Sequence, residues 1–469
     1  MKSRRLLTTI LLLFLSIISN AQWSAPVNLS PASVSAGLNE SMGSCIGVSG
    51  DTIHVVWCDR LGSNKGAIYY THSTDTGLTW SNPLPITNLN GNAWNPAIAV
   101  NGANIHLVWR EIDTINNKRS SHYCRSLNSG NNWGQNVVLD TVVADWPAVA
   151  VSGNRVYVAN DIVTATSPYN TEVFFLRSTD NGATWSAHQQ ITFAAGRSED
   201  EAIMAEGSFI HMAWNDNRFN NKMRILYKNS SDYGVTWSED DTIAAPYGYG
   251  TMVNAGGSNV DVPFSGAPSG HYQIHLVQSA DNGSSWGTDH DLTHDPVNTY
   301  YYPYLVRDSA DLHLTYVKSG VGGQYLHSGD GGTTWDPSYT FFSGIIGITA
   351  FSAYTACVLH IIYANNSDHH IYYLRNPTGN AGHCQITTNV AENKIPGIIS
   401  VYPNPAKDYL TIESSLKTIE IFNVEGQNSK IIHNQGKETT LDLTNFSSGV
   451  YIIKGWTDKE VSIMKFIKE

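Results

Sequence analysis

Charged residues are scarce in this sequence, and their balance is acidic. Asp, Glu, Lys and Arg make up 14% of the 469 residues, and the formal net charge is -12. Because phosphate binding needs clustered Lys and Arg, we expect no nucleic-acid partner. No stretch has zinc-ligand or calcium-loop spacing, so we predict no cofactor and no metal site, although the many acidic loops leave calcium binding open.

Cysteines are few, and their number is odd. Five of them are scattered over the chain, which excludes a disulfide scaffold. If the protein is exported, Cys45 with Cys58 and Cys357 with Cys384 are the pairs to test for bridges. Buried thiols without a bridge are the equal alternative.

Long apolar runs are absent except at the start of the chain. Basic Lys2, Arg4 and Arg5 precede an apolar run from Leu6 to Ile18 and the small-residue end Ser19–Ala21. This order predicts a cleaved signal peptide at residues 1–21, with a buried strand or membrane anchor as the alternative. We expect no transmembrane segment in the mature chain, and loss of the three basic residues would take its formal charge from -12 to -15.

One eight-residue stretch recurs six times. Ser178–Trp185 reads STDNGATW, and related stretches end at Trp80, Trp133, Trp237, Trp286 and Trp335. Successive copies are 53, 52, 52, 49 and 49 residues apart. A period of this length indicates a repeat architecture.

The recurring stretch, called the turn motif below, has the composition of a tight turn with an anchor. Its acid can accept hydrogen bonds from the backbone of its own turn, its Gly provides a positive φ, and its Trp can pack under the turn. We therefore predict a structural role for its acidic or amide position and its Trp. These residues are Asp75, Asn128, Asp180, Asp232, Asp281, Asp330, Trp80, Trp133, Trp185, Trp237, Trp286 and Trp335.

Each repeat contains the pattern of four short strands. Segments such as Pro96–Val100, Ile105–Trp109 and Val173–Arg177 alternate apolar and polar residues between Gly turns, which is typical of antiparallel strands. Four strands in about fifty residues predict one propeller blade. Second strands occur at His54, His106, Tyr157, His211, Asp261, His313 and His360, and we expect the recurring histidines to be structural.

The seventh repeat lacks a turn motif and a fourth strand. Trp23–Leu29 resembles the Trp80–Ile86 segment that follows a turn motif, so we predict that it pairs beside the segment ending at Arg375 and closes the ring. The predicted fold is all-β: a seven-bladed β-propeller over 22–375, with six blades as the alternative, followed by a small β-sandwich.

The turn motif resembles the Asp box of sialidase-like (BNR repeat) propeller families. Five of the six copies keep Ser, Asp, Gly and Trp in place. The resemblance implies the fold but not catalysis, since such boxes lie away from the active-site mouth. Enzymes of this kind use a Tyr nucleophile with a Glu, an Asp acid/base and three Arg, beginning with an Arg-Ile-Pro-type segment. Here Glu40–Val48 has no arginine, so no catalytic residue is carried over.

The last part of the chain has a different pattern. Turn-forming residues at 376–397 predict a linker, and 398–469 contains about seven short strands, which favours a small β-sandwich. Val401–Pro405 and Ser448–Lys454 resemble the type A C-terminal sorting domain of type IX secretion cargo from Bacteroidetes. The resemblance implies that the type IX machinery is a partner and that the protein is secreted or attached to the outer-membrane surface.

Topology predicts where a ligand would bind. The loops from fourth to first and from second to third strands share one face, called the mouth face below, opposite the turn motifs. Residues following second strands are Asp59, Arg60, Arg110, Glu111, Asp161, Asp216 and Arg218. Residues preceding first strands are Trp94, Trp146, Glu199, Asp200, Glu201, Tyr249, Tyr300, Tyr301 and Tyr302.

Three functions fit these candidates. Aromatic planes, acids and guanidinium groups on one face suit a monomeric propeller that binds a glycan or a protein. An exo-α-sialidase-type glycoside hydrolase is the alternative, and the missing arginine makes binding the favoured hypothesis. A purely structural surface protein is the third.

Overall fold

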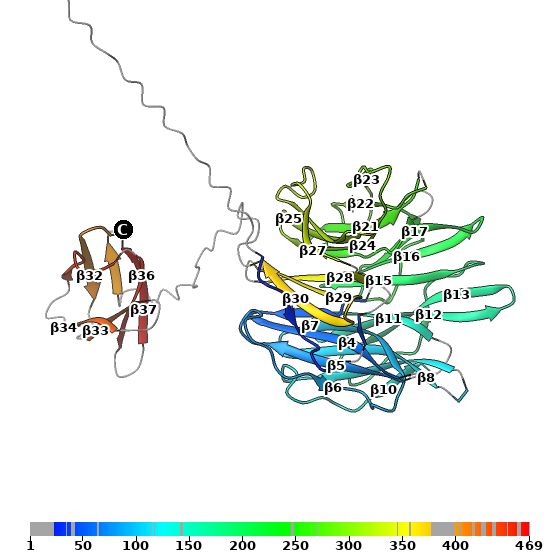
Figure 1. Cartoon of the computed structure of the whole chain (residues 1–469), viewed down its shortest axis with the longest axis horizontal. Coiled ribbons are helices and arrows are strands. Elements are labelled where there is room, and N and C mark those ends of the chain that lie inside the picture. The colour runs from blue at the N-terminus through cyan, green and yellow to red at the C-terminus, as the bar shows by residue number, and fades with distance from the viewer. Residues whose placement is uncertain are drawn as a thin grey trace, which may run out of the picture. The chain divides into compact units, whose positions relative to one another are not determined.

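The computed structural model describes residues 23–376 and 399–468, with gaps at 34, 39–42, 63–64, 114, 117, 141–143, 245–247, 269, 345, 356–357, 403, 405, 415–417, 424–427, 434–437, 448 and 457–460. The predicted signal peptide and nearly all of the predicted linker lie outside these residues. The chain divides into two compact units, Met1–Gln385 and Ile386–Glu469 (Figure 1). The described residues form strands and turns and no helix, which confirms the all-β class. They accordingly include no helix long and apolar enough to cross a membrane.

The described residues of the first unit form seven antiparallel sheets, numbered here in chain order. Sheet 1 has β2 (Ala36–Gly37), β3 (Ile46–Ser49), β4 (Thr52–Gly62), β5 (Lys65–Ser73) and β6 (Leu84–Pro85). Sheet 2 has β7 (Ala93–Asn101), β8 (Asn104–Asp113), β9 (Lys118–Ser126) and β10 (Val137–Asp140). Sheet 3 has β11 (Ala144–Ser152), β12 (Arg155–Thr166), β13 (Tyr169–Ser178) and β14 (Gln189–Gln190).

The remaining sheets repeat this order. Sheet 4 has β15 (Ser198–Glu206), β16 (Phe209–Phe219), β17 (Lys222–Ser230) and β18 (Asp241–Thr242). Sheet 5 has β19 (Gly248–Tyr249), β20 (Asn254–Gly256), β21 (Asn259–Gly266), β22 (Gln273–Ser279) and β23 (His290–Asp291). Sheet 6 has β24 (Tyr300–Asp308), β25 (Asp311–Lys318), β26 (Gly322–Ser328) and β27 (Tyr339–Ser343). Sheet 7 joins β28 (Ile346–Thr355), β29 (Val358–Asn365) and β30 (His370–Asn376) to the N-terminal β1 (Val27–Asn28).

The turn motif has the predicted hydrogen bonds. In the first copy, Asp75 Oδ1 accepts from the Thr79 backbone N–H at 2.8 Å and from the Ser73 hydroxyl at 2.7 Å. Its Oδ2 accepts from the Thr79 hydroxyl at 2.6 Å. The Thr79 and Ser73 hydrogen bonds lower the pKa of Asp75 to about 2. The acid therefore holds the turn closed as an ionised acceptor.

A tyrosine from the preceding sheet explains why the motif needs glycine. Tyr123 of sheet 2 packs edge-on against Trp185 of the sheet 3 motif, with ring centroids 4.9 Å apart. Gly182 has φ of +78°, and a Cβ built there would lie 1.8 Å from the Tyr123 hydroxyl oxygen. The Trp thus locks one sheet to the next, as predicted, and the Gly makes room for the ring.

The recurring second-strand histidines form hydrogen bonds with the tyrosines that pack against the turn-motif tryptophans. The His106 Nδ1 lies 2.8 Å from the Tyr123 hydroxyl oxygen, and the His211 Nδ1 lies 2.6 Å from that of Tyr227. Burial lowers the pKa of both histidines to about 4. Neutral, buried and bonded to tyrosine, they have the structural position that their recurrence predicts.

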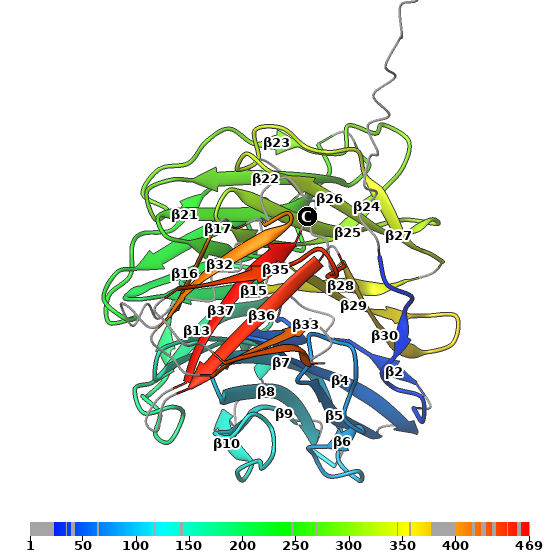
Figure 2. The ribbon, with the colours of Figure 1, turned by 90° about the vertical axis from the view of Figure 1, so that its left-hand side faces the viewer.

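The predicted exchange between the chain ends is confirmed. β1 pairs with β30, with Val27 opposite Tyr373. The Ser24 N–H donates to the Arg375 carbonyl at 2.9 Å, as the Ser81 N–H donates to the His72 carbonyl in sheet 1 at 2.8 Å. Figure 2 shows this blue N-terminal segment beside the yellow β30.

Trp23 takes the place of a turn-motif tryptophan in sheet 7. Its ring meets Tyr325 of sheet 6 edge-on at 5.3 Å and stacks on Tyr339 at 5.7 Å. Sheet 7 in turn contacts sheet 1, because Tyr373 packs against Trp80 at 4.7 Å. The contact between successive sheets therefore also joins the last sheet to the first.

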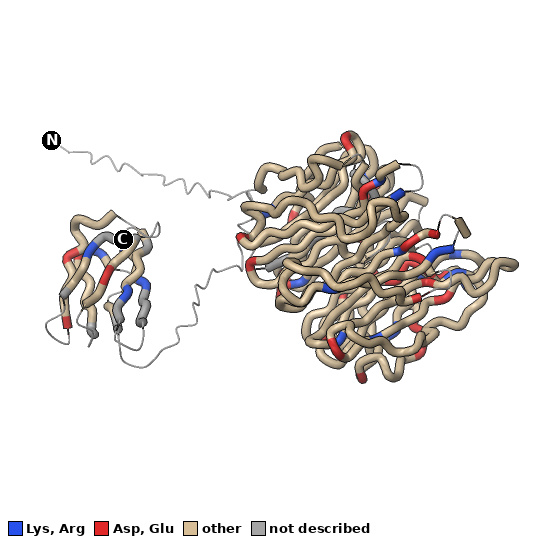
Figure 3. Tube along the Cα trace, turned by 90° about the horizontal axis from the view of Figure 1, so that it is seen from below, with Lys and Arg blue, Asp and Glu red and all other residues tan. Residues whose placement is uncertain are grey.

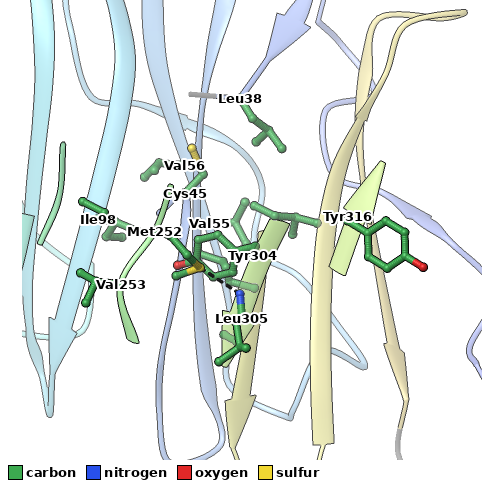
Figure 4. Packing of buried hydrophobic residues seen from close by; sticks show 14 of the residues in the cluster. Leu38, Cys45, Val55, Val56, Ile98, Met252, Val253, Tyr304, Leu305 and Tyr316 are labelled. Carbon is green, nitrogen blue, oxygen red and sulfur yellow. Dashed lines mark hydrogen bonds between the residues drawn. The ribbon is translucent and has the colours of Figure 1, made fainter. Parts of the chain in front are cut away.

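Inner strands from distant parts of the chain share one core (Figure 4). The Ile98 N–H donates to the Ser44 carbonyl at 2.7 Å, and the Leu305 N–H donates to the Met252 sulfur at 2.9 Å. The disulfide considered for Cys45 and Cys58 is not present in the described structure. The Cys45 thiol instead donates to the Pro96 carbonyl and the Cys58 thiol to that of Ala93, each at 3.2 Å. Cys357 and Cys384 lie outside the described residues.

The second unit contains two sheets around its own core. One has β31 (Ile399–Tyr402), β32 (Tyr409–Ser414) and β35 (Glu438–Asp442). The other has β33 (Thr418–Asn423), β34 (Asn428–His433), β36 (Gly449–Trp456) and β37 (Val461–Lys468). Buried residues of both sheets, among them Leu410, Ile421 and Phe466, belong to one apolar cluster.

Candidate functional site

A break in strand register shapes the mouth face. In sheets 2, 3, 4 and 6 the first strand leaves two residues out of its pairing with the second, as between Trp94 and Ala97. One residue at each break has a positive φ: Asn95 at +52°, Trp146 at +48°, Asp200 at +56° and Tyr302 at +52°. Such bulges turn side chains out of the usual alternation. They bring three of the predicted candidates, Trp146, Asp200 and Tyr302, to equivalent places.

The three predicted arginines are held by different partners. The Arg60 guanidinium lies 4.9 Å from the Trp94 ring centroid, and that of Arg110 lies 5.0 Å from the centroid of Trp146. Arg110 also forms an ion pair with Asp145. Cation–π stacking and ion pairing thus engage Arg60 and Arg110 within the protein.

Arg218 is committed to two acids of its own sheet. It donates to both carboxylate oxygens of Asp216, at 2.8 and 2.7 Å, and to Asp240 at 2.7 Å. Burial acts to raise the pKa of Asp216, but the hydrogen bonds from Arg218 outweigh it and lower that pKa. No pair among Arg60, Arg110 and Arg218 shares an ion-pair partner in the described structure.

Two predicted acids hold loops rather than face solvent. Asp59 accepts from the Ser35 backbone N–H at 3.0 Å. Glu111 accepts from the Asn92 backbone N–H at 3.0 Å and from the Trp109 indole N–H at 3.1 Å. These bonds fix the segments that precede the first strands, so Asp59 and Glu111 position the mouth.

A group of carboxyls lies at the boundary between sheets 3 and 4. Asp161 is 4% exposed and Glu201 is 0% exposed. Within the described chain, the two carboxylate oxygens of Glu201 and the Oδ1 of Asp161 have no hydrogen-bond partner. Burial, and then repulsion from neighbouring acids, raises the pKa of both carboxyls well above the usual range. Burial and the charge of Glu199 raise the pKa of Asp200 to about 7.

The fold explains how these acids meet. Ala159 of β12 and Trp214 of β16 belong to the apolar cluster between sheets 3 and 4, and Asp161 has the same strand orientation as Ala159. Glu201 lies in the bulge of β15, where sheets 2, 3 and 6 have Pro96, Pro147 and Pro303. Among charged groups, the carboxyl of Asp161 contributes most to the raised pKa of Glu201, so the two residues lie near one another.

Aromatic residues border these acids. Tyr249 of β19 meets Tyr302 of β24 edge-on at 6.1 Å. Burial raises the pKa of Tyr249, and Asp200 is the strongest charged contributor. Burial likewise raises the pKa of Tyr169, followed by the charge of Asp161. Tyrosine rings and buried carboxyls therefore lie in one neighbourhood on the mouth face.

Charged residues elsewhere are sparse, with acidic and basic positions interspersed along the tube in Figure 3. Across the described ranges, no group of three or more His, Cys, Asp or Glu side chains is arranged to hold a metal ion. Sequence reasoning had nominated Asp161 and Glu199–Glu201 but not their partners Asp145, Arg119 and Arg197. Aligning the repeats on their register breaks would have found Asp145, which occupies the position of Trp94.

Comparison with known families identifies both parts of the chain. The profile of the BNR repeat-like domain matches residues 14–314. The chain belongs to the BNR repeat-like domain family. The secretion system C-terminal sorting domain matches residues 400–469 of this BNR repeat protein, which implies interaction with the type IX secretion machinery and a secreted or cell-surface location.

Solved structures with a similar fold include sialidases. The BNR repeat protein is 14% identical to the Hadza microbial sialidase Hz136, with 68% of this chain and 73% of that chain covered and a TM-score of 0.44. For the Trypanosoma rangeli sialidase the identity is 10%, the coverage 91% and 84%, and the TM-score 0.45. A Dyadobacter fermentans protein of unknown function is 14% identical, with 62% and 96% covered and a TM-score of 0.45. Comparison with curated proteins finds no match.

Proposed function

We propose that this protein is a type IX secretion cargo whose first unit binds glycans through its mouth face. The observation that carries the proposal is the proximity of tyrosine rings to Asp200 and to two buried carboxyls, Asp161 and Glu201, which have oxygens without a hydrogen-bond partner in the described structure. Aromatic rings stack on the C–H faces of sugars, and carboxyl groups bond sugar hydroxyls. A protein ligand fits less well, since the buried core of a protein–protein interface is depleted of charged residues.

We further propose that the seven sheets are blades of one closed propeller. The contact of Tyr373 with Trp80 and the pairing of β1 with β30 support closure, because each links the last sheet to an early part of the chain. We divide the chain into a signal peptide at 1–21, the propeller at 22–375, a linker at 376–397 and a C-terminal β-sandwich at 398–469. We infer a monomer of Bacteroidetes origin, as its sorting-domain resemblance implies.

The surroundings of the arginines disfavour sialic acid as the ligand. A sialic acid carboxylate needs converging guanidinium groups, whereas Arg60, Arg110 and Arg218 are each engaged by residues of the protein. The carboxyls of Asp161, Asp200 and Glu201 also provide no positive charge for an anionic sugar. The proposed ligand is therefore an uncharged or cationic glycan.

A glycoside hydrolase is the second candidate, and one observation favours it. Burial raises the pKa of Asp161 and Glu201 well above the usual range of a carboxyl, the direction that a general acid for glycosidic cleavage requires. Against it, the described residues around this pair provide no assigned nucleophile or base.

The test is binding and turnover by the mature full-length protein. On a glycan array we expect signals that fall at least tenfold for Trp146→Ala and Tyr249→Phe combined, and that persist in Trp133→Phe on the opposite face. Fluorogenic glycosides, including a sialoside, are assayed in parallel with alanine variants of Arg60, Arg110 and Arg218. Binding without turnover supports the binding function, turnover supports the hydrolase, and the absence of both overturns a glycan-directed function.

A further inference from the structure

We propose that the mouth face selects a sugar carrying a protonated amine, which binds Asp161, Asp200 and Glu201 at the boundary between sheets 3 and 4. The inference rests on the glycan-binding function proposed above and names the class of sugar. Its basis is a comparison of two neighbouring boundaries that the repeat makes equivalent.

At the boundary between sheets 2 and 3, a cation and an acid meet. Arg110 lies opposite Trp94 in sheet 2 and reaches Asp145 and Trp146 in sheet 3. Its equivalent in sheet 3 is Asp161, which lies opposite Asp145. The chain thus supplies a guanidinium group at one boundary and a carboxyl at the corresponding place of the next.

At the boundary between sheets 3 and 4, the charged groups that act on Asp161 are all carboxyls, and the Asn215 amide N–H donates to the Asp200 carboxylate at 3.0 Å. The charges of Glu199 and Asp200 contribute to the raised pKa of Asp161. These two residues occupy the places that Asp145 and Trp146 occupy in sheet 3. Glu201 follows them, fully buried and with both oxygens lacking a hydrogen-bond partner among the described residues. The position that holds a cation at the preceding boundary holds none here.

The described cationic groups near the site are fewer than its carboxyls. Five carboxyls gather here, those of Asp145, Asp161, Glu199, Asp200 and Glu201. Their described cationic partners are three guanidinium groups: Arg110 and Arg119 pair with Asp145, and Arg197 pairs with Glu199 at 3.1 Å. Buried acids without a cation must keep protons or gain a cationic partner.

A protonated amine would supply this site with both a positive charge and hydrogen-bond donors. It brings one positive charge and three N–H donors in a compact group, which unpartnered carboxylate oxygens accept. Asp200 is only partly buried and has its left-handed backbone at the bulge, so an incoming amine meets it before the buried pair. Tyr249 lies near enough for the charge of Asp200 to raise its pKa, and its ring meets that of Tyr302 edge-on at 6.1 Å, so these rings are where we place the sugar.

The experiment compares two oligosaccharides of equal length by calorimetry on the mature full-length protein. One is a glucosamine tetramer with free amines, and the other is its N-acetylated counterpart. We expect the free amine to bind about tenfold or more tightly, since hydrogen bonds to charged groups exceed those to neutral ones. Equal affinity for both overturns the inference while leaving glycan binding intact, and no binding of any glycan on the array overturns the proposed function itself.

Proton release gives a second, independent measurement. The groups facing the site are Asp145 on β11, Asp161 on β12, Tyr169 on β13, Glu199, Asp200 and Glu201 on β15, Tyr249 on β19, and the guanidinium groups of Arg110, Arg119 and Arg197. An amine that replaces the protons on the acids must release them. We therefore expect the measured enthalpy to differ between phosphate and Tris buffers, and an identical enthalpy in both overturns the inference.

Variants locate the amine. Asp161→Asn and Glu201→Gln should each abolish the preference for the free amine while retaining binding of the acetylated tetramer. Asp308→Asn, the same acid-to-amide substitution at an exposed position of β24, is the control and should keep the preference. If a buried variant fails to fold, the partly exposed Asp200→Asn provides the test. A preference that survives in Asp161→Asn, Glu201→Gln and Asp200→Asn alike overturns the assigned site.

Discussion

Carboxylates on the two faces of the first unit lie in opposite surroundings. In the turn motif, the exposed Asp180 accepts hydrogen bonds from Ser178 and Thr184, and those from Thr184 are the largest cause of its lowered pKa. On the mouth face, Asp161 and Glu201 are buried, and burial raises their pKa. The same chemical group has a lowered pKa on one face and a raised pKa on the other.

The comparison shows what the repeat conserves within this one chain. Ser, acid and Gly recur at the turn motif because each turn needs the same donors and the same φ. Positions on the mouth face differ from sheet to sheet, as Pro147 and Glu201 do at equivalent bulges. The turn-motif face therefore repeats the same residues, and the differences that a ligand can recognise lie on the mouth face.

We expect the largest effect from a substitution in the turn motif. In Gly182→Ala the new Cβ would lie 1.8 Å from the Tyr123 hydroxyl oxygen at a φ of +78°. Steric overlap and the left-handed backbone together should lower the free energy of unfolding by about 2 to 5 kcal/mol. Urea denaturation of the mature protein measures the change.

Gly153→Ala is the matched control. Its φ of +61° is also left-handed, but nothing lies within 4 Å of the added Cβ. Only the backbone term remains, and we expect a loss of about 1 kcal/mol. Equal losses in the two variants would mean that the tyrosine contact does not require glycine.

The next effect concerns the sheet that lacks its own turn motif. Trp23→Ala removes the ring that meets Tyr325 and stacks on Tyr339. Because the ring is half-buried, we expect a loss of about 2 kcal/mol in the free energy of unfolding, below that of a core tryptophan.

Val27→Ala, which trims an exposed side chain on the same strand, should change stability by less than about 0.5 kcal/mol. Differential scanning calorimetry compares both variants with the parent. If Trp23→Ala is as mild as Val27→Ala, the N-terminal strand does not stabilise sheet 7.

Periodic residues made most of the fold predictable. Six copies of the turn motif and alternating strands predicted the all-β class, and the likeness of Trp23–Leu29 to Trp80–Ile86 predicted the pairing of β1 with β30. The positive φ at Asn95, Trp146, Asp200 and Tyr302 was not predictable, because four different residue types adopt it. There the conformation is imposed by packing between strands and not by local preference.

The positions of the candidate site residues were predictable, but their ion pairs and pKa shifts were not. Topology placed Asp161, Glu201 and Arg110 on the mouth face. Whether an arginine there is open to a ligand depends on side chains distant in sequence, such as Asp145, which pairs with both Arg110 and Arg119. The raised pKa of Asp161 likewise follows from burial between two sheets, which spacing along the chain does not specify.

A smaller effect tests the comparison through the direction in which a substitution changes stability. Asp161→Asn replaces a buried acid without a partner at its Oδ1, so we expect a gain of about 1 to 2 kcal/mol in the free energy of unfolding at pH 8. A raised folded pKa means that the unfolded chain loses its proton first as pH rises. In the parent, this group therefore costs stability as pH increases from about 4, and the variant should lack that loss.

Urea unfolding of both proteins at pH 5 and pH 8 makes the test. The difference between them should be larger at pH 8, where the parent must hold a buried proton or a buried charge. Asp200→Asn should behave alike between pH 4 and 7, since its folded pKa is about 7. A larger difference at pH 5 would contradict the direction of both shifts.

The smallest expected effect is the same substitution on the opposite face. Asp180→Asn keeps an Oδ1 acceptor for the backbone N–H groups of Ala183 and Thr184 but loses the charge that strengthens those bonds. The second motif already carries Asn128, whose Oδ1 accepts from the Asn132 N–H at 2.9 Å, so the turn tolerates the amide. We expect a slight loss of stability at pH 7 that becomes smaller as the pH falls below the ordinary pKa of an acid, because the unfolded parent then takes up a proton before the folded one. A gain in stability, as predicted for Asp161→Asn, would show that the two faces do not differ in how they treat a carboxylate.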